Sequence, residues 1–111
     1  MSTPAALGFR MPAEWEPHAS TWLTWPRPEG ISFPDKYETV PPVYAAFIRQ
    51  LTQGEAVNIN VWNAEMEATV RSLLGAEKVS LERVRFHHFP AYEPWCRDHG
   101  PIFLTRENNG R

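Results

Sequence analysis

The chain has 111 residues, of which 42% are hydrophobic and 22% are charged, and its formal net charge at pH 7 is -2. This composition is typical of a folded globular domain, and its charge gives no electrostatic reason to expect a nucleic-acid or membrane partner. The sequence lacks an apolar run near the about 20 residues of a membrane span, and its N-terminus lacks the features of a secretory signal. Its single cysteine excludes an internal disulfide, so we expect a cytoplasmic location.

The first part of the chain predicts an arm, a strand and a long loop. Residues 1–17 contain prolines and no clear period, which indicates an irregular N-terminal arm. Residues 20–25, STWLTW, alternate and are rich in aromatic and β-branched side chains, which predicts a strand that ends at Pro26. Residues 26–40 then form a long loop, a type of segment that is often functional in compact domains.

The middle of the chain predicts a helix, a strand and a second helix. Two consecutive prolines suit a helix start, and Gly54 suits its end. The apolar stripe of this helix comprises Val43, Ala46, Phe47, Ile48 and Leu51. Residues 56–62 alternate apolar residues with asparagine, which predicts a strand with one dry and one polar face. Asn63 suits the N-cap of a helix that ends at Gly75.

The last part of the chain predicts two more strands, at residues 84–89 and 101–105. The order β-α-β-α-β, followed by β, indicates an α/β fold with parallel neighbouring strands. The Asn-Asn-Gly sequence at 108–110 is a strong signal for a tight hairpin turn. Because this hairpin has a first strand and a turn but no second strand, we expect residues 1–111 to be a single, incomplete segment from the N-terminal part of a longer protein.

The residues best suited to chemistry lie in the stretch PWCRDHGP, at 94–101. A carboxylate such as Asp98, held among tryptophans, can bind a guanidinium group through two parallel charge-assisted hydrogen bonds. Arg97 would keep Asp98 ionised, and Trp95 could cover the bound cation or its alkyl stem. Because residues 95 and 98 face opposite sides of an extended chain, they share a ligand only where the chain bends. The alternative is a capped turn with a local ion pair.

Cys96 and the histidines give weaker indications of a functional site than Asp98 does. Arg97 and His99 would face away from Cys96 in an extended chain, so nothing activates its thiol, and we expect a packing residue. His87 and His88 face opposite sides of a strand and cannot chelate one ion, so we expect no metal site. The first strand is not followed by a glycine-rich phosphate loop, which disfavours a nucleotide-binding fold of the Rossmann type.

Two motifs resemble those of the agmatine deiminase family, whose bacterial members are often labelled peptidylarginine deiminases. MPAEWEPH at 11–18, followed by TWLTWP at 21–26, is similar to the N-terminus of that family. WCRDHGP at 95–101 is similar to its W-x-R-D-x-G-P motif. The resemblance, which covers residues 9–105, implies a pentein-type fold, a five-bladed α/β propeller. This chain would supply about one ββαβ-like blade and the start of the next.

The resemblance also implies the hydrolysis of agmatine to N-carbamoylputrescine and ammonia through a covalent thiouronium intermediate, without a metal or an organic cofactor. Asp98 matches the first of two guanidinium-binding acids, and Trp95 matches a wall against the alkyl chain of the substrate. Arg97, Gly100 and Pro101 match positions that shape the motif. The nucleophilic cysteine, the general acid/base histidine and the second acid would lie beyond residue 111, so the chain alone would be inactive.

Several alternatives stay open at this stage. The substrate is either agmatine, whose product would feed putrescine synthesis, or arginine within a peptide or protein. The chain is either part of such a deiminase or a self-contained, non-catalytic α/β binding module. The implied partners are a small guanidinium substrate and the remainder of the chain's own protein, with a homo-oligomer as an open question, whereas neither nucleic acid nor a membrane is expected.

Overall fold

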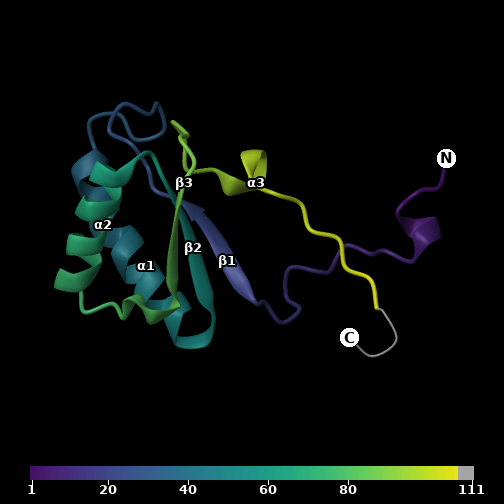
Figure 1. The fold of residues 1–111 in the computed structure, drawn as a ribbon. Coiled ribbons are helices and arrows are strands. Elements are labelled where there is room, and N and C mark those ends of the chain that lie inside the picture. The colour runs from purple at the N-terminus through teal and green to yellow at the C-terminus, as the bar shows by residue number, and fades with distance from the viewer. Residues whose placement is uncertain (108–111) are drawn as a thin grey trace.

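The computed structural model describes residues 1–107, and its centre is a three-stranded parallel sheet with two helices on one face (Figure 1). The strands, in their order across the sheet, are β1 (Ser20–Thr24), β2 (Ala56–Val61) and β3 (Val84–His88). The helices α1 (Val40–Gly54) and α2 (Ala64–Ala76) each connect two neighbouring strands. The predicted α/β order with parallel neighbours is therefore confirmed.

The hydrophobic core lies between the sheet and the two helices. Val57, Ile59 and Val61 of β2 are almost completely buried there, and Ile48 of α1 packs with them. The other buried core residues are Trp25, Ala45, Val70, Leu74, Val79 and Val84. The alternation of β2 thus separates a dry face from the polar face predicted for this strand.

Two details of the helices differ from the sequence prediction. The buried side of α1 is centred on Ile48, whereas Val43 is 66% exposed and Phe47 is 49% exposed. Each residue turns a helix by about 100°, so Val43 and Phe47 lie to one side of the helix face that Ile48 presents to the sheet. The buried apolar stripe of α1 is therefore narrower than predicted. The second helix extends one residue beyond Gly75, the end predicted for it, and the residue in the left-handed conformation after this helix is Lys78 (φ 57°).

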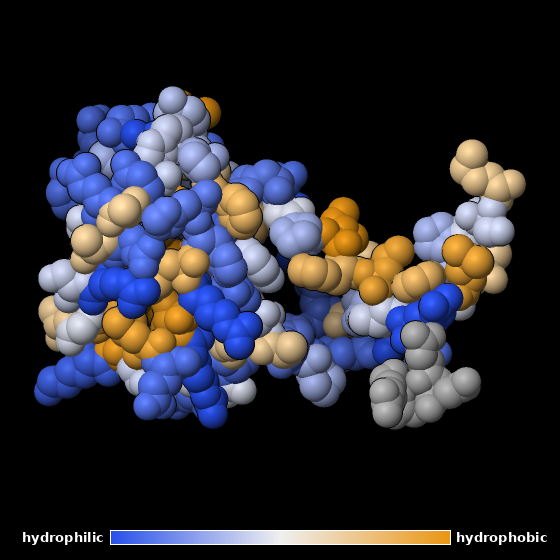
Figure 2. Space-filling model, viewed as in Figure 1, coloured by the Kyte–Doolittle hydropathy of each residue, from blue (hydrophilic) through white to orange (hydrophobic). Residues whose placement is uncertain are grey.

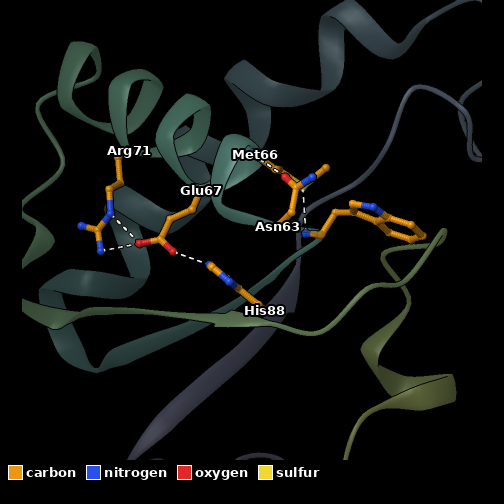
Figure 3. Close-up of polar contacts among 6 residues, drawn as sticks. Asn63, Met66, Glu67, Arg71 and His88 are labelled. Atoms are coloured by element: carbon orange, nitrogen blue, oxygen red, sulfur yellow. Dashed lines mark hydrogen bonds and ion pairs between the residues drawn. The ribbon is translucent and has the colours of Figure 1, made fainter.

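Polar contacts fix the start of α2 and connect this helix to β3 (Figure 3). The side-chain oxygen of Asn63 accepts a hydrogen bond from the Met66 N–H at 2.9 Å, which confirms the predicted cap. The Glu67 carboxylate accepts hydrogen bonds from His88 Nε2 at 2.6 Å and from Arg71 Nε at 2.8 Å. These hydrogen bonds lower the pKa of Glu67, and the bond from His88 has the largest effect. His88 therefore faces the helix layer.

The chain after β3 does not form the fourth strand predicted at 101–105, so that prediction is wrong. The 3-10 helices Ala5–Leu7, Tyr37–Thr39 and Leu81–Arg83 and the short helix α3 (Cys96–His99) complete the described elements. Residues 101–105 run beside the N-terminal arm, and Thr105 forms an antiparallel bridge with Arg10 there. Pro101 has no N–H to donate to a ladder, which favours this departure from the sheet. The predicted hairpin turn at 108–110 lies outside the described residues.

The two end segments project from the sheet layer, and hydrophobic side chains gather along them (Figure 2). The large apolar residues exposed on these segments are Met1, Leu7, Met11, Trp15, Ile102, Phe103 and Leu104. Within the arm, Arg10 pairs with Glu16 at 2.8 Å, and this hydrogen bond lowers the pKa of Glu16 to about 2. Among residues 1–107, every helix is too short or too polar to cross a membrane.

Candidate functional site

The centre of the WCRDHGP motif forms α3 (Cys96–His99), a single helical turn over the open face of the sheet, with Trp95 and Gly100 at its two ends. The Cys96 Sγ lies 3.2 Å from the hydroxyl of Thr24 at the end of β1, so Cys96 packs against the sheet as predicted. The Asp98 N–H donates to the carbonyl oxygen of Trp95 at 2.9 Å. Residues three apart in such a turn lie on one side of it. The motif therefore bends into a turn instead of the extended stretch expected from the sequence, and such a bend is the condition for Trp95 and Asp98 to share a ligand.

Asp98 is exposed, and its carboxylate has no hydrogen bond or ion pair with any of the described residues. The local ion pair between Arg97 and Asp98, on which the alternative interpretation of this motif depended, does not form, because Arg97 Nη2 instead pairs with Glu14 Oε1 at 2.7 Å. Both partners of this pair are largely exposed, so it contributes little stability. Its consequence is geometric: Arg97 connects α3 to the N-terminal arm and leaves the Asp98 carboxylate accessible.

Trp95 is held in place by the long loop that follows β1. Its indole N–H donates to the hydroxyl oxygen of Ser32 at 2.8 Å, and its ring lies 6.1 Å from that of Phe33. The Glu93 carboxylate accepts hydrogen bonds from the Ser32 hydroxyl and, at 2.7 Å, from the Ile31 N–H. The hydrogen bond from Ser32 is the largest cause of a lowered pKa at Glu93. About half of the Trp95 side chain stays exposed.

Sequence reasoning missed Ser32 and Glu93, which are 61 residues apart in the chain. Neither belongs to a recognisable spacing pattern, and the one signal that pointed to Ser32 was the length of the loop at 26–40. The structure shows what this loop does: it contacts the segment before α3 and fixes the orientation of the Trp95 ring.

Gly100 closes the α3 turn at very short range. Its N–H donates to the carbonyl oxygen of Cys96 at 2.6 Å. A Cβ atom at position 100 would overlap that same carbonyl oxygen, although the φ of Gly100, -77°, is ordinary. Gly100 is therefore needed for close approach rather than for an unusual backbone angle. This gives a physical reason for the motif-shaping role predicted for Gly100, and Pro101 then directs the chain away from the sheet.

The open face of the sheet beside α3 is polar. The rings of Trp22 and His87 stack at 4.8 Å, and His87 Nε2 lies 2.9 Å from the Asn58 side-chain oxygen. Asn60 donates to the Thr24 hydroxyl at 3.2 Å, whereas its own side-chain oxygen is buried without a partner among residues 1–107. A cavity of about 480 Å³ adjoins this face. It is lined by Trp22, Asn60, Phe89, Pro90, Ala91, His99, Gly100 and Pro101.

Other hollows and clusters contribute nothing to this site. A larger hollow of about 830 Å³ lies between the two end segments and contains no residue of the motif. His87 and His88 point to opposite faces of β3, as their adjacency predicts. Across residues 1–107, His, Cys, Asp and Glu side chains do not gather in groups of three that could hold a metal ion.

The W-x-R-D-x-G-P motif, which carries the sequence resemblance, thus forms an exposed turn on an α/β segment. Comparison with known proteins agrees: residues 10–110 match the Porphyromonas-type peptidyl-arginine deiminase family, and the chain belongs to this family.

Three curated relatives are named as agmatine deiminases, one of them as "putative". The chain is 40% identical over 111 residues to a Streptomyces avermitilis protein named "Putative agmatine deiminase". It is 36% identical over 114 residues to an agmatine deiminase of Ectopseudomonas mendocina and 33% identical over 110 residues to one of Stutzerimonas stutzeri. These matches cover 98–99% of this chain but 27–30% of the relatives. The chain therefore spans less than a third of the length of the curated relatives it matches.

Proposed function

We propose that this chain is the N-terminal part of an agmatine deiminase, which hydrolyses agmatine to N-carbamoylputrescine and ammonia. The observation that carries the proposal is the exposed Asp98 carboxylate, free of described partners, on the α3 turn that also bears Trp95. The names of the relatives point to the same substrate. In this proposal the parallel sheet is one blade of a pentein propeller.

Asp98 would bind the guanidinium group of the substrate. A carboxylate can accept two parallel N–H bonds from a guanidinium, and the engagement of Arg97 with Glu14 leaves both Asp98 oxygens available for them. Trp95 would lie along the alkyl chain of the substrate, because half of its side chain is exposed while its indole N–H is anchored on Ser32. The two side chains would thus recognise the charged end and the apolar stem of one ligand.

The reaction needs groups that we assign to parts of the protein outside these 111 residues. A cysteine thiolate there would attack the guanidinium carbon, and a histidine would protonate the leaving ammonia, which gives a covalent thiouronium. Water activated by the same histidine would then add to this carbon and expel the thiolate, which leaves a ureido product. Asp98 and a second acid would hold the carbon in line for both steps. The thiol of Cys96 lies against Thr24 and serves none of them.

A second substrate class, arginine within a peptide, is favoured by the description of the family, which names peptidyl-arginine deiminases. The two candidate substrates are distinguished with the complete protein, in which this segment is joined to the remainder of its length. This protein is supplied either with agmatine or with an arginine-containing peptide. Ammonia release from agmatine together with N-carbamoylputrescine supports our proposal, whereas citrulline formation in the peptide alone overturns it.

The role of Asp98 is tested in the same complete protein. Loss of one clamp carboxylate leaves a guanidinium partly unpaired, which costs a few kcal/mol, so Asp98→Asn is expected to lower kcat/KM about a hundredfold or more. Asp35→Asn is the matched control, because Asp35 is exposed in the loop and has a positive φ of 58° that asparagine tolerates. Equal activity of the two variants would exclude Asp98 from the site.

The remaining alternative is a non-catalytic binding module, and the exposed apolar side chains of Ile102 and Phe103 count against it. We expect the isolated 111-residue chain to release no ammonia and to self-associate through this surface. A monomer in sedimentation analysis with one sharp thermal transition would instead favour the self-contained module.

A further inference from the structure

We propose that Glu93 is a positioning residue, which fixes the Trp95 indole through the hydroxyl of Ser32 and thereby sets the affinity of the site for the alkyl chain of its substrate. This inference rests on the proposed function, because it takes Trp95 to be a wall of the substrate site. Glu93 itself has no direct contact with Asp98 among the described residues.

The direction of the hydrogen bonds follows from the groups that make them. An ionised carboxylate can only accept, so the single proton of the Ser32 hydroxyl points to Glu93 Oε2. The lone pairs of the same hydroxyl oxygen are then free to accept the indole N–H of Trp95 at 2.8 Å. The ionised state of Glu93 therefore dictates how Ser32 presents its oxygen to Trp95.

The loop is built to approach Glu93 closely. The second oxygen of this carboxylate accepts the Ile31 N–H at 2.7 Å. A Cβ atom on Gly30 would lie 2.9 Å from Glu93 Oε1 and 2.8 Å from the Tyr92 carbonyl oxygen, so only glycine fits there. Phe33 adds an aromatic contact to Trp95 at 6.1 Å. Two segments far apart in the sequence thus converge on the orientation of one ring.

This arrangement predicts an effect on substrate binding rather than on the chemical step. A ring that contacts the unreactive stem binds substrate and transition state alike, so its misplacement raises KM and leaves kcat unchanged. Loss of the hydrogen bond that holds the Trp95 indole on Ser32 should cost about 1 kcal/mol of binding free energy. We therefore expect the KM for agmatine to rise about fivefold to tenfold. Asp98, by contrast, acts on the group that reacts.

The test uses four single variants and one double variant of the complete protein, with agmatine as substrate. Glu93→Gln keeps one acceptor oxygen and places an amide donor where the other accepted, so it cannot accept from both Ser32 and Ile31. Ser32→Ala removes the connecting hydroxyl. Ser32→Thr keeps that hydroxyl and is expected to restore a normal KM. Glu38→Gln, an exposed site next to the same loop, is the charge-matched control. The double variant Glu93→Gln/Ser32→Ala should have the KM of one single variant, because both act on one chain of hydrogen bonds.

A second measurement needs no catalysis. Trp95→Phe identifies the indole N–H resonance of Trp95 in the ¹⁵N spectrum of the complete protein, because it is the indole resonance that this variant lacks. We expect this resonance to shift, and its proton to exchange about fivefold to tenfold faster, in Glu93→Gln and Ser32→Ala but not in Glu38→Gln.

The outcomes separate this inference from the proposed function. If Trp95→Phe or Asp98→Asn impairs agmatine turnover while Glu93→Gln keeps a normal KM, the positioning role is wrong and the proposed function stands. If the unsubstituted protein does not turn over agmatine, the proposed function fails and takes the kinetic claim with it. An unchanged indole resonance in both loop variants overturns the positioning role regardless of activity.

Discussion

Replacement of Gly100 by alanine should open the α3 turn, and the size of the effect follows from what the new Cβ atom meets. The Cβ would overlap the carbonyl oxygen of Cys96, which is backbone and cannot move aside like the end of a flexible side chain. To relieve the overlap the turn must give up the hydrogen bond from the Gly100 N–H, at about 1 kcal/mol. The contact of the Cys96 thiol with Thr24 weakens at the same time. Together these changes should lower the stability of the closed turn by about 1–2 kcal/mol.

Cys96 supplies the assay, because it is the only cysteine in the chain and lies partly buried within this turn. When a turn opens and closes faster than it is modified, labelling of the thiol follows the population of the open form. A local loss of about 1–2 kcal/mol should therefore accelerate labelling by an aromatic disulfide about 5–30-fold.

Gly75→Ala is the control for the substitution itself. A Cβ at Gly75 would meet no atom of residues 1–107 within 4 Å, so alanine should leave the labelling rate unchanged. Alanine in a helix should also raise the free energy of unfolding by about 0.5–1 kcal/mol. Equal labelling rates in Gly100→Ala and the unsubstituted chain would refute the claim that close approach is why glycine is required at position 100.

Three further predictions concern stability. Asn63→Ala should lower the free energy of unfolding by about 1 kcal/mol in urea titrations, whereas aspartate at this N-cap should retain it; equal losses would contradict a capping role. Ile59→Ala should cost about 2–5 kcal/mol because Ile59 is completely buried, while Ile31→Ala, at an 87% exposed side chain, should stay within about 0.5 kcal/mol. Glu16 has a pKa lowered to about 2, so its contribution to the arm should be complete above pH 4.5 and disappear as the pH falls through about 2; a carboxyl midpoint near 4.5 by NMR would show that the Arg10 pair does not form in solution.

The sheet and helices could be predicted because their signals are local. The alternation of residues 56–61 and the cap at Asn63 are decided by neighbours in the chain, and the structure has both. The segment at 101–105 has the composition of a strand, yet it forms none, because strand formation also needs an available partner edge and Pro101 cannot donate to one. The exposure of Val43 and Phe47 likewise depends on which side of α1 meets the sheet, which propensity does not encode.

The candidate site could be predicted only in part, for the same reason. Asp98 and Trp95 stand out in the sequence because they lie in one motif. The ion pair of Arg97 with Glu14 could not be predicted, because Glu14 is far from Arg97 in the sequence and only the neighbouring Asp98 suggested a partner. The contacts of Glu93 with the loop connect segments that no local pattern relates.

Physical chemistry explains why Asp98 on an open surface would be half of a site. Between exposed charges at contact distance, the attraction is about 1 kcal/mol in water, and measured exposed ion pairs give about 0–1 kcal/mol. That is far below what selective binding of a small cation requires. The attraction between the same carboxylate and a guanidinium becomes several-fold stronger when water is excluded and a second acid accepts the remaining guanidinium N–H groups. Three features support a surface that further protein would cover: the polar face beside α3, the Asn60 oxygen that is buried without a partner among residues 1–107, and the exposed apolar side chains of Ile102 and Phe103. In our proposal, that cover both dries the Asp98 site and brings the nucleophile to it, so that guanidinium recognition and catalysis arise together.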